Sequence, residues 1–319
     1  MAVYTDVDRE TLQGFLRRNY DLGELIDFAG IPEGIQNTNY YVKTEKGKFI
    51  LTLFERRTPT RDLPFFFDFM KHLDGKGFSC PLPVATKAGY PLTELVKKPA
   101  VLVTFLPGLS IEKPSPTQCF ASGELIGRLH RAGKKFQKTR ENLFSPKRVE
   151  TMFKKLQPGI SGTWPGWEKE IEAELAFQAA NPLKGLPFGT IHADVFPENV
   201  FFKGDAATGL IDFYFACRDF LAFDLAIALS CWGFNIQGTL LREHFKSMLE
   251  GYEKIRPLTK KERAALPILL RRASLSFLMT RVEDVLHPPG NILGMQKDPK
   301  EFMNILANQQ KRGHIEDYF

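Results

Sequence analysis

The chain of 319 residues has little of what marks several common classes of protein. It has four cysteines, no C-x-x-C pair and no histidine cluster with metal-ligand spacing. These absences argue against a disulfide framework and against a structural zinc site. We expect Cys80, Cys119, Cys217 and Cys231 to be reduced and mostly buried. The chain also lacks the G-x-x-x-x-G-K-[ST] and G-x-G-x-x-G patterns, which excludes a Walker phosphate loop and a Rossmann fingerprint.

No apolar run is long enough to cross a membrane. One of the longest, Leu225 to Phe234, falls well short of the roughly 20 residues that a spanning helix needs. Acidic residues precede any apolar run at the start of the sequence, which is not typical of a secretory signal, so we expect a cytoplasmic protein. The net charge is only +6, and the densest basic run, at 134–138, has no nucleic-acid motif around it. We therefore expect neither nucleic acid nor membrane as a partner; the oligomeric state stays open.

The length suits two lobes, and the composition, with 43% hydrophobic and 25% charged residues, is typical of a globular protein. The first hundred residues predict a small α+β lobe with an antiparallel sheet. It begins with a helix at 5–20, for which Thr5 and Asp8 have capping-box spacing. The expected strands are 25–29, 40–44, 49–54 and 100–106, with a hairpin link at 45–48 and a second helix at 63–73. Turn punctuation at Pro107-Gly108 places the lobe boundary there, giving lobes of 1–107 and 108–319.

The second lobe is expected to be larger and mainly helical. Candidate helices are 116–136, 167–180, 220–230, 240–254, 260–285 and 299–310. Residues 188–213 break this pattern, because they are rich in glycine, valine, phenylalanine and isoleucine and predict short strands.

The polar residues of this strand-rich segment carry the chemistry. It contains His192-Ala193-Asp194-Val195-Phe196-Pro197-Glu198-Asn199 and, further on, Gly209-Leu210-Ile211-Asp212-Phe213. The runs 200–202 and 209–211 should pair as an antiparallel hairpin, in which the start of the first strand lies beside the end of the second. Asn199 and Asp212 flank that hairpin, so their side chains can converge with Asp194 upstream. Two carboxylates and an amide oxygen suit Mg²⁺.

Phosphoryl transfer needs a cation on the phosphates and a carboxylate that orients the attacking hydroxyl and accepts its proton. We assign the second task to Asp194 and metal binding to Asn199 and Asp212. The H-x-D-x-x-x-x-N spacing followed by an aspartate matches the catalytic and metal loops of protein kinases. We expect His192 to have a structural role, since it would brace the loop by hydrogen bonds. His130, within a predicted helix, is interpreted as a packed histidine.

The nucleotide contacts are less orthodox. The candidate phosphate loop is 34–39, where backbone N–H groups and the short side chains of Asn37, Thr38 and Asn39 could cradle phosphates. Thr104 and Leu106 are further candidate nucleotide contacts near the lobe boundary. In most kinases a lysine projects from the third strand, but here Thr52 stands in its place. A nucleotide-binding pseudokinase without turnover therefore stays open as an alternative.

The catalytic motif departs from protein kinases in ways that resemble the aminoglycoside phosphotransferase-like kinases. Ala193 stands in place of arginine, Ile211-Asp212-Phe213-Tyr214 replaces Asp-Phe-Gly, and no Ala-Pro-Glu follows. The stretch 219–226, Asp-Phe-Leu-Ala-Phe-Asp-Leu-Ala, is similar to that family's Asp-x-x-x-x-Asp-Leu-Ala helix start. The resemblance implies a two-lobed, protein-kinase-like α+β fold. It also implies a structural Asp224 that holds the catalytic loop.

Five stretches resemble, more closely, the bacterial homoserine kinases of this phosphotransferase-like type: 36–42, 49–55, 99–108, 192–199 and 209–217. The resemblance implies ATP and Mg²⁺, L-homoserine as acceptor, O-phospho-L-homoserine as product and a place in threonine biosynthesis. The acceptor's carboxylate needs a cationic contact. Arg271, Arg272 and Arg281, on one predicted helix, are the candidates. A sister kinase acting on choline, methylthioribose, hydroxylysine or an aminoglycoside stays open as a second alternative, beside the pseudokinase.

Overall fold

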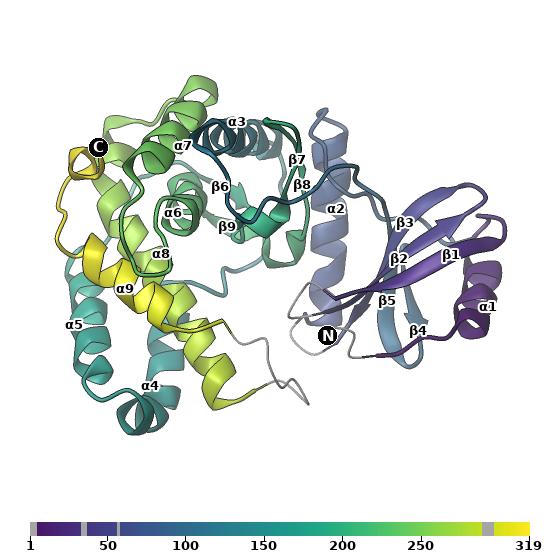
Figure 1. The fold of residues 1–319 in the computed structure, drawn as a ribbon, viewed down its shortest axis with the longest axis horizontal. Coiled ribbons are helices and arrows are strands. Elements are labelled where there is room, and N and C mark those ends of the chain that lie inside the picture. The colour runs from purple at the N-terminus through teal and green to yellow at the C-terminus, as the bar shows by residue number, and fades with distance from the viewer. Residues whose placement is uncertain (1–4, 33–36, 56–57, 289–296) are drawn as a thin grey trace. The chain divides into compact units, whose positions relative to one another are not determined.

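The computed structural model describes residues 5–32, 37–55, 58–288 and 297–319. The chain divides into two compact units, Met1–Pro107 and Gly108–Phe319. The first unit is built on a five-stranded antiparallel sheet and the second is mainly helical, which confirms the predicted α+β fold class (Figure 1). Across the described ranges, no helix combines the length and the apolar character needed to cross a membrane.

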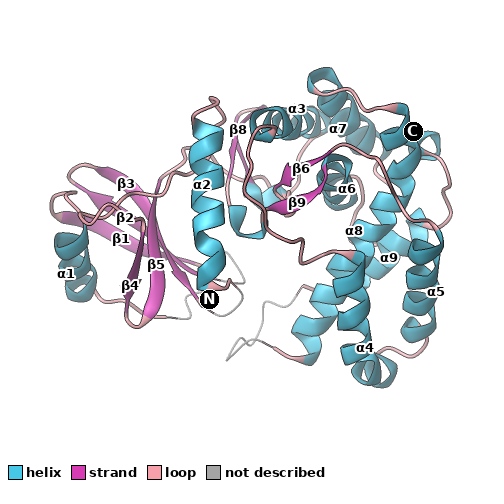
Figure 2. Ribbon diagram, turned by 180° about the vertical axis from the view of Figure 1, so that it is seen from behind, coloured by secondary structure: helices cyan, strands magenta, loops and turns pink. Residues whose placement is uncertain are grey.

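The N-terminal lobe is a sheet with a helix on each side. The strand order is β1-β2-β3-β5-β4, and every neighbouring pair is antiparallel. The two helices lie on opposite sides of the sheet (Figures 1 and 2). The elements are α1 (Arg9–Asn19), β1 (Leu25–Ile31), β2 (Asn37–Thr44), β3 (Gly47–Phe54), a 3₁₀ turn (Thr60–Asp62), α2 (Leu63–Asp74), β4 (Leu92–Leu95) and β5 (Lys98–Thr104).

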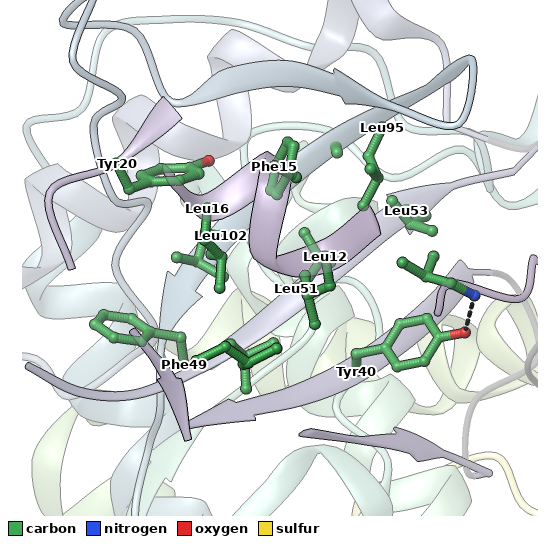
Figure 3. Packing of buried hydrophobic residues seen from close by; sticks show 14 residues of the cluster. Leu12, Phe15, Leu16, Tyr20, Tyr40, Phe49, Leu51, Leu53, Leu95 and Leu102 are labelled. Atoms are coloured by element: carbon green, nitrogen blue, oxygen red, sulfur yellow. Dashed lines mark hydrogen bonds between the residues drawn. The ribbon is translucent and has the colours of Figure 1, made fainter. Parts of the chain in front are cut away.

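Alternation along the strands decides which residues form the core of this lobe. On β2, Tyr40 and Val42 point to the side on which α1 packs, and they join Leu12 and Phe15 of α1 in one buried cluster (Figure 3). The Tyr40 hydroxyl lies at the edge of this cluster and accepts the N–H of Val7 at 3.0 Å. Residues of opposite parity, such as Asn37 and Asn39, lie on the other face of the sheet.

The start of α1 corrects one prediction. The helix begins at Arg9, and Asp8 is its N-cap, accepting the N–H of Thr11 at 2.7 Å. Thr5 therefore does not cap it. Its hydroxyl instead donates to Glu55, at the end of β3, at 2.7 Å. An aspartate placed before the first turn satisfies an orphan N–H as well as the predicted threonine would.

The C-terminal lobe surrounds one helix, α6, whose side chains are almost all buried. Helices α3, α7 and α8 contact it (Figures 1 and 2). Two short antiparallel pairs, β6 with β9 and β7 with β8, complete the lobe. The helices are α3 (Pro116–Gly133), α4 (Pro146–Thr163), α5 (Trp167–Ala180), α6 (Leu221–Trp232), α7 (Arg242–Ile255), α8 (Lys260–Leu286) and α9 (Lys300–Gln309). The strands are β6 (Phe188–Ile191), β7 (Val200–Lys203), β8 (Ala206–Leu210) and β9 (Cys217–Phe220), with 3₁₀ turns at Pro197–Asn199, Phe213–Phe215 and Ile315–Tyr318.

Two glycines let α3 and α7 approach backbone to backbone. A Cβ on Gly123 would lie 2.1 Å from the carbonyl oxygen of Met248, and one on Gly251 would lie 2.0 Å from that of Phe120. Any larger residue would force the helices apart. This close packing sets Tyr252 of α7 against His130 of α3, a contact on which the catalytic loop depends.

Candidate active site

The hairpin β7–β8 brings two of the predicted site residues to one place. Val200 pairs with Leu210, so Asn199 and Ile211 adjoin the open end of the hairpin. The N–H of Ile211 donates to the carbonyl of Asn199 at 2.9 Å. Asn199 and Asp212 consequently lie at the same end of the strand pair, as the sequence predicted.

Asp194 joins them from the loop that follows β6. The amide of Asn199 donates to the carbonyl of Asp194 at 2.8 Å and to its carboxylate at 3.0 Å. These bonds use the NH₂ group, which leaves the amide oxygen for another donor or a cation. Asp194, Asn199 and Asp212 form one polar cluster, which we call the catalytic cluster.

The electrostatics of the catalytic cluster are unfavourable for its own charges. Burial raises the pKa of Asp194 well above its ordinary value, and the nearby carboxylates of Asp212 and Glu198 raise it further. Lys297, which pairs with Glu198, acts in the opposite direction. Loss of surrounding water likewise raises the pKa of Asp212 to about 6. Asp212 keeps contact with solvent at its surface, whereas Asp194 is half-buried.

Two carboxylates held together with a carboxamide oxygen fit a hard cation such as Mg²⁺. The raised pKa values of Asp194 and Asp212 explain why a cation would be stabilised here. A divalent ion would offset the repulsion between the two carboxylates and favour both ionised forms. Within the part of the chain that the structure describes, no cluster of three or more His, Cys, Asp or Glu side chains has metal-binding geometry. A cation here would rely on Asp194 or Asp212, the amide of Asn199, and its other ligands.

The backbone of the catalytic cluster is held in uncommon conformations. Ala193 has φ of 65° and Asp212 has φ of 61°, both in the left-handed region. Non-glycine residues seldom occupy this region unless the surrounding structure imposes it. Asp224 holds the backbone at Ala193 in this conformation. Its carboxylate accepts the N–H of His192 at 2.9 Å and that of Ala193 at 2.8 Å.

His192 connects the backbone next to Asp212 with the backbone of Asp194. Its Nε2 lies 2.9 Å from the carbonyl of Ile211, and its Nδ1 accepts the N–H of Asp194 at 3.2 Å. The first contact requires Nε2 to carry the proton. Burial lowers the pKa of His192 to about 4, so the ring is neutral and donates only to Ile211. These contacts favour the structural role predicted for it.

A buried chain of hydrogen bonds continues from Asp224 and was not predicted. His130 Nε2 lies 3.1 Å from Asp224, and its Nδ1 lies 2.8 Å from the Tyr252 hydroxyl. Arg256 donates to that hydroxyl at 2.8 Å and to Glu262 at 2.7 Å. Because the Tyr252 oxygen accepts from Arg256, its proton goes to His130 Nδ1, which leaves Nε2–H to donate to Asp224.

His130 is thus more than a packed histidine. Burial alone would raise the pKa of Asp224, but the hydrogen bonds that it accepts from His130 and from the N–H of His192 bring it below the ordinary value. His130 lies 94 residues from Asp224 and 122 from Tyr252. No local pattern in the sequence indicates such distant partners.

In the N-terminal lobe, the structure describes Asn37, Thr38 and Asn39, while the predicted loop residues 34–36 lie outside the described ranges. Thr38 donates to Glu55 at 2.8 Å. Asn39 accepts from Thr52 at 2.8 Å, so the residue in the usual lysine position is bonded across the sheet. Asn37 is buried, and its Oδ1 has no hydrogen-bond partner among the described residues.

The two predicted contacts near the lobe boundary differ. The N–H of Thr104 donates to the carbonyl of Leu82 at 2.9 Å, and its hydroxyl accepts the N–H of Leu82 at 2.9 Å. Both groups are therefore used within the lobe. Leu106 is half-buried, and its N–H has no hydrogen-bond partner in the described part of the chain.

The three arginines predicted for the acceptor separate. Arg271 binds the fully buried Glu174, with a closest distance of 2.5 Å, and stacks on Phe177. Arg272 binds Asp219 at 2.5 Å and donates to the carbonyl of Phe144. Both fasten α8 to other parts of the lobe.

Arg281 is connected to the catalytic loop through an aromatic cluster. Phe196, two residues after Asp194, packs on Phe277 and Phe302, with ring centroids 4.9 and 6.3 Å away. The Arg281 guanidinium lies 4.4 Å from the Phe302 ring and 2.5 Å from Glu301. This aromatic cluster joins the catalytic loop to a charged pair.

A kinase-like α+β fold with these polar residues in its hairpin defines a class of protein, the phosphotransferases. Residues 27–258 match the sequence model of the phosphotransferase enzyme family, and the chain belongs to that family. Among solved structures, an amicoumacin kinase in complex with AMP-PNP, Ca²⁺ and Ami has a TM-score of 0.71, at 16% identity, covering 96% of this chain and 92% of the other. A spectinomycin phosphotransferase has a TM-score of 0.66, at 14% identity over 98% of both chains.

The sequence relatives define the branch of that family. A homoserine kinase of Xanthobacter autotrophicus is 44% identical over 100% of this chain and 99% of its own length. A homoserine kinase of Methylorubrum populi has the same identity and coverage. That of Gluconobacter oxydans is 42% identical over 99% of this chain and all of its own. The predicted resemblance to homoserine kinases of the phosphotransferase type is confirmed.

Proposed function

We propose that this protein is a homoserine kinase, which transfers the γ-phosphoryl group of ATP to the hydroxyl of L-homoserine and releases ADP and O-phospho-L-homoserine. The observation that carries the proposal is the catalytic cluster, in a chain that aligns end to end with homoserine kinases. This reaction supplies the phosphorylated intermediate of threonine biosynthesis. The cytoplasmic location stays a prediction.

Asp194 is the residue that we assign to the acceptor hydroxyl. It orients the hydroxyl and takes its proton while the oxygen bonds to phosphorus and the bond to the β-phosphate oxygen breaks. Its raised pKa suits this task, since a stronger base accepts a proton more readily. Asn199 holds the carboxylate in place through its amide donors.

Asp212 and the amide oxygen of Asn199 are the proposed ligands of Mg²⁺. When bound, the ion neutralises phosphate charge and holds the γ-phosphate in position. His192 and Asp224 fix the backbone on which Asp194 and Asp212 are carried. In the N-terminal lobe, Asn37–Asn39 are the proposed phosphate contacts and the Leu106 N–H the proposed adenine contact; Thr104 then supports the strand end.

For the acceptor we propose Arg281 and its neighbours. L-Homoserine carries a carboxylate and an ammonium group, and Arg281 with Glu301 offers one charge of each sign beside Phe196 of the catalytic loop. The substrate would exchange partners with an existing ion pair, so no buried charge is left alone. The contacts of Arg271 and Arg272 give no support for an acceptor role.

An acceptor panel tests the proposal. We expect kcat/KM with Mg·ATP to be highest for L-homoserine among L-serine, choline, methylthioribose, hydroxylysine and kanamycin. A tenfold advantage for another acceptor, about 1.4 kcal/mol in transition-state binding, would leave a kinase but not a homoserine kinase. No ADP release with any acceptor would instead favour the pseudokinase.

The acceptor site is tested on the enzyme's own substrate. Arg281→Gln and Glu301→Gln should each raise KM for L-homoserine by about tenfold or more and leave KM for ATP unchanged. Arg263→Gln is the matched control, because Arg263 lies on the same helix but pairs with Glu253. An unchanged KM in both variants would place the acceptor's charges elsewhere.

A further inference from the structure

The C-terminal lobe contains a cavity that the catalytic cluster does not line. Its volume is about 1140 Å³, and it lies between the start of α4, the end of α5, strands β6 and β9, and α8. Its floor is a buried polar set: Arg272 binds Asp219, and Asn142 donates to the same carboxylate at 2.7 Å. The cavity is large enough for an organic molecule of the size that protein pockets commonly bind.

The charges around this cavity do not balance. Five cationic residues and three carboxylates line it. Each carboxylate has a cationic partner: Asp219 pairs with Arg272 at 2.5 Å, Glu141 with Arg148 at 3.1 Å, and Glu283 with Lys155 at 3.4 Å. Lys147 and Arg218 remain without a carboxylate partner in the described part of the chain.

Two further features favour a negative ligand. The Nε atoms of Arg218 and Arg272 are buried and have no hydrogen-bond partner among the described residues, which is costly for a guanidinium. The 18-residue helix α4 also begins at this cavity with no acidic residue in its first turn. The positive end of its dipole therefore adds to the charge of Lys147.

The cavity also has an aromatic wall. Phe188 is 53% exposed although it lies in a strand. Its ring packs edge to face with that of Phe220, and the two ring centroids are 5.8 Å apart. The guanidinium of Arg218 lies over the Phe188 ring at 5.4 Å. An exposed ring beside an unpaired cation suits a ligand with both an anionic group and a flat apolar part.

We propose that this cavity is a second binding site, for a small organic anion that pairs its charge with Arg218 and Lys147 and lays its apolar part on Phe188. The site is connected to the chemistry through its walls. Arg218 and Asp219 belong to β9, which pairs with β6, and Ile191 at the end of β6 leads directly into His192. The inference does not rest on the identity of the acceptor.

Isothermal titration of the full chain with phenyl phosphate and with benzoate tests the site. The two probes share a ring and distinguish a phosphate from a carboxylate ligand, and benzyl alcohol is the uncharged control. We expect at least one anion to bind, the alcohol to bind far more weakly, and saturating Mg·ATP to leave the affinity unchanged. Competition by Mg·ATP would assign the probe to the phosphoryl-transfer site and overturn the proposal.

Variants locate the bound probe. Arg218→Gln should weaken binding about tenfold or more, and Lys147→Gln, at an exposed position that cannot disturb the core, should weaken it several-fold. Lys260→Gln, an exposed cation at the start of α8, is the matched control and should bind as the parent does. Thermal unfolding checks that each variant is folded. Unchanged affinity in Lys147→Gln and Arg218→Gln, or no binding up to about 10 mM, far weaker than a specific site would bind, would overturn the proposal.

Discussion

Asp194, in the loop after β6, and Asp224, in α6, are two aspartates of the active site whose carboxylates have different partners. Asp224 accepts hydrogen bonds from two backbone N–H groups and from His130. Asp194 accepts from Asn199 and faces the carboxylates of Asp212 and Glu198. The pKa of Asp224 is lowered and that of Asp194 is raised.

This difference distinguishes a carboxylate that stabilises the fold, Asp224, from one that is proposed to take part in the reaction, Asp194. A buried carboxylate whose lone pairs are all taken by donors stabilises the fold and has nothing left for a substrate. A carboxylate with few donors and like-charged neighbours costs stability and is kept where its basicity is used. The contrast predicts that substitutions at the two positions should affect activity and stability in opposite proportions.

Removal of the charge at Asp194 should have the largest effect on activity. We expect Asp194→Asn to lower kcat by about 10²–10⁴-fold, because the acceptor hydroxyl loses its base. Stability should be unchanged or slightly higher, since a repelled, desolvated charge is gone. ATP binding should survive, because the candidate nucleotide contacts belong to the N-terminal lobe.

Steady-state kinetics and urea denaturation measure the two quantities. Asp205→Asn, in the exposed turn of the β7–β8 hairpin, is the matched control and should change neither. Near-parental turnover in Asp194→Asn would remove Asp194 from the catalytic role.

At Asp224 the main loss should be in stability. We expect Asp224→Asn to lower the free energy of unfolding by about 3 kcal/mol, because the new NH₂ group meets donors and His130 loses its acceptor. Activity should fall as well, since the N–H groups of His192 and Ala193 lose their anchor. Chemical denaturation gives the value. A variant as stable as the parent but inactive would instead make Asp224 a participant in the reaction.

The same contrast explains what the sequence could reveal. The hairpin and its flanking residues were predictable, because Asn199 and Asp212 adjoin two short apolar strands and a strand pair fixes which ends meet. The Asp224 network was not, because His130 and Tyr252 are distant in sequence and meet only where Gly123 and Gly251 allow two helices to touch.

Two elements of the C-terminal lobe, α4 and β9, were not predicted, because contacts with residues distant in the sequence determine them. Helix α4 was missed because it contains Pro158, Gly159 and Gly162, which count against a helix. Packing against α8 overrides them: a Cβ on Gly159 would lie 2.7 Å from the side chain of Leu286, so a larger residue there would push that side chain aside. Strand β9 was missed because its partner is β6, across the whole catalytic segment.

The pH dependence of Mg²⁺ binding should report on the unfavourable charges of the catalytic cluster. The raised pKa of Asp212, about 6, means that the folded protein holds a proton there more tightly than the unfolded chain does. Stability from this group is therefore present below pH 4 and lost as pH rises through 6. Mg²⁺ competes with that proton, so its affinity should rise with pH through about 6, with proton release.

Calorimetry in two buffers of different ionisation enthalpy counts the protons. Asp212→Asn should abolish the proton release from this group and flatten the rise in affinity near pH 6. His192 cannot account for the change, since its pKa of about 4 leaves it neutral over this range. An Mg²⁺ affinity that is independent of pH between 5 and 7 would contradict the assigned metal site.

The smallest effect on stability and turnover should come from a substitution of Ala193. This residue precedes Asp194 in the chain, and its N–H donates to Asp224. Its φ of 65° favours glycine, whereas its buried methyl group and the greater freedom of glycine in the unfolded chain favour alanine. These contributions are each about 1 kcal/mol and oppose one another, so the free energy of unfolding of Ala193→Gly should lie within about 1 kcal/mol of the parent's. Turnover should be kept, because glycine retains the N–H that Asp224 accepts. Ala193→Val supplies the contrast: a β-branched side chain at positive φ in a buried position should destabilise the fold by several times as much. If Ala193→Gly loses tenfold in kcat while its unfolding is unchanged, the methyl group itself positions Asp194, and the hydrogen bonds of Asp224 do not suffice to hold the loop.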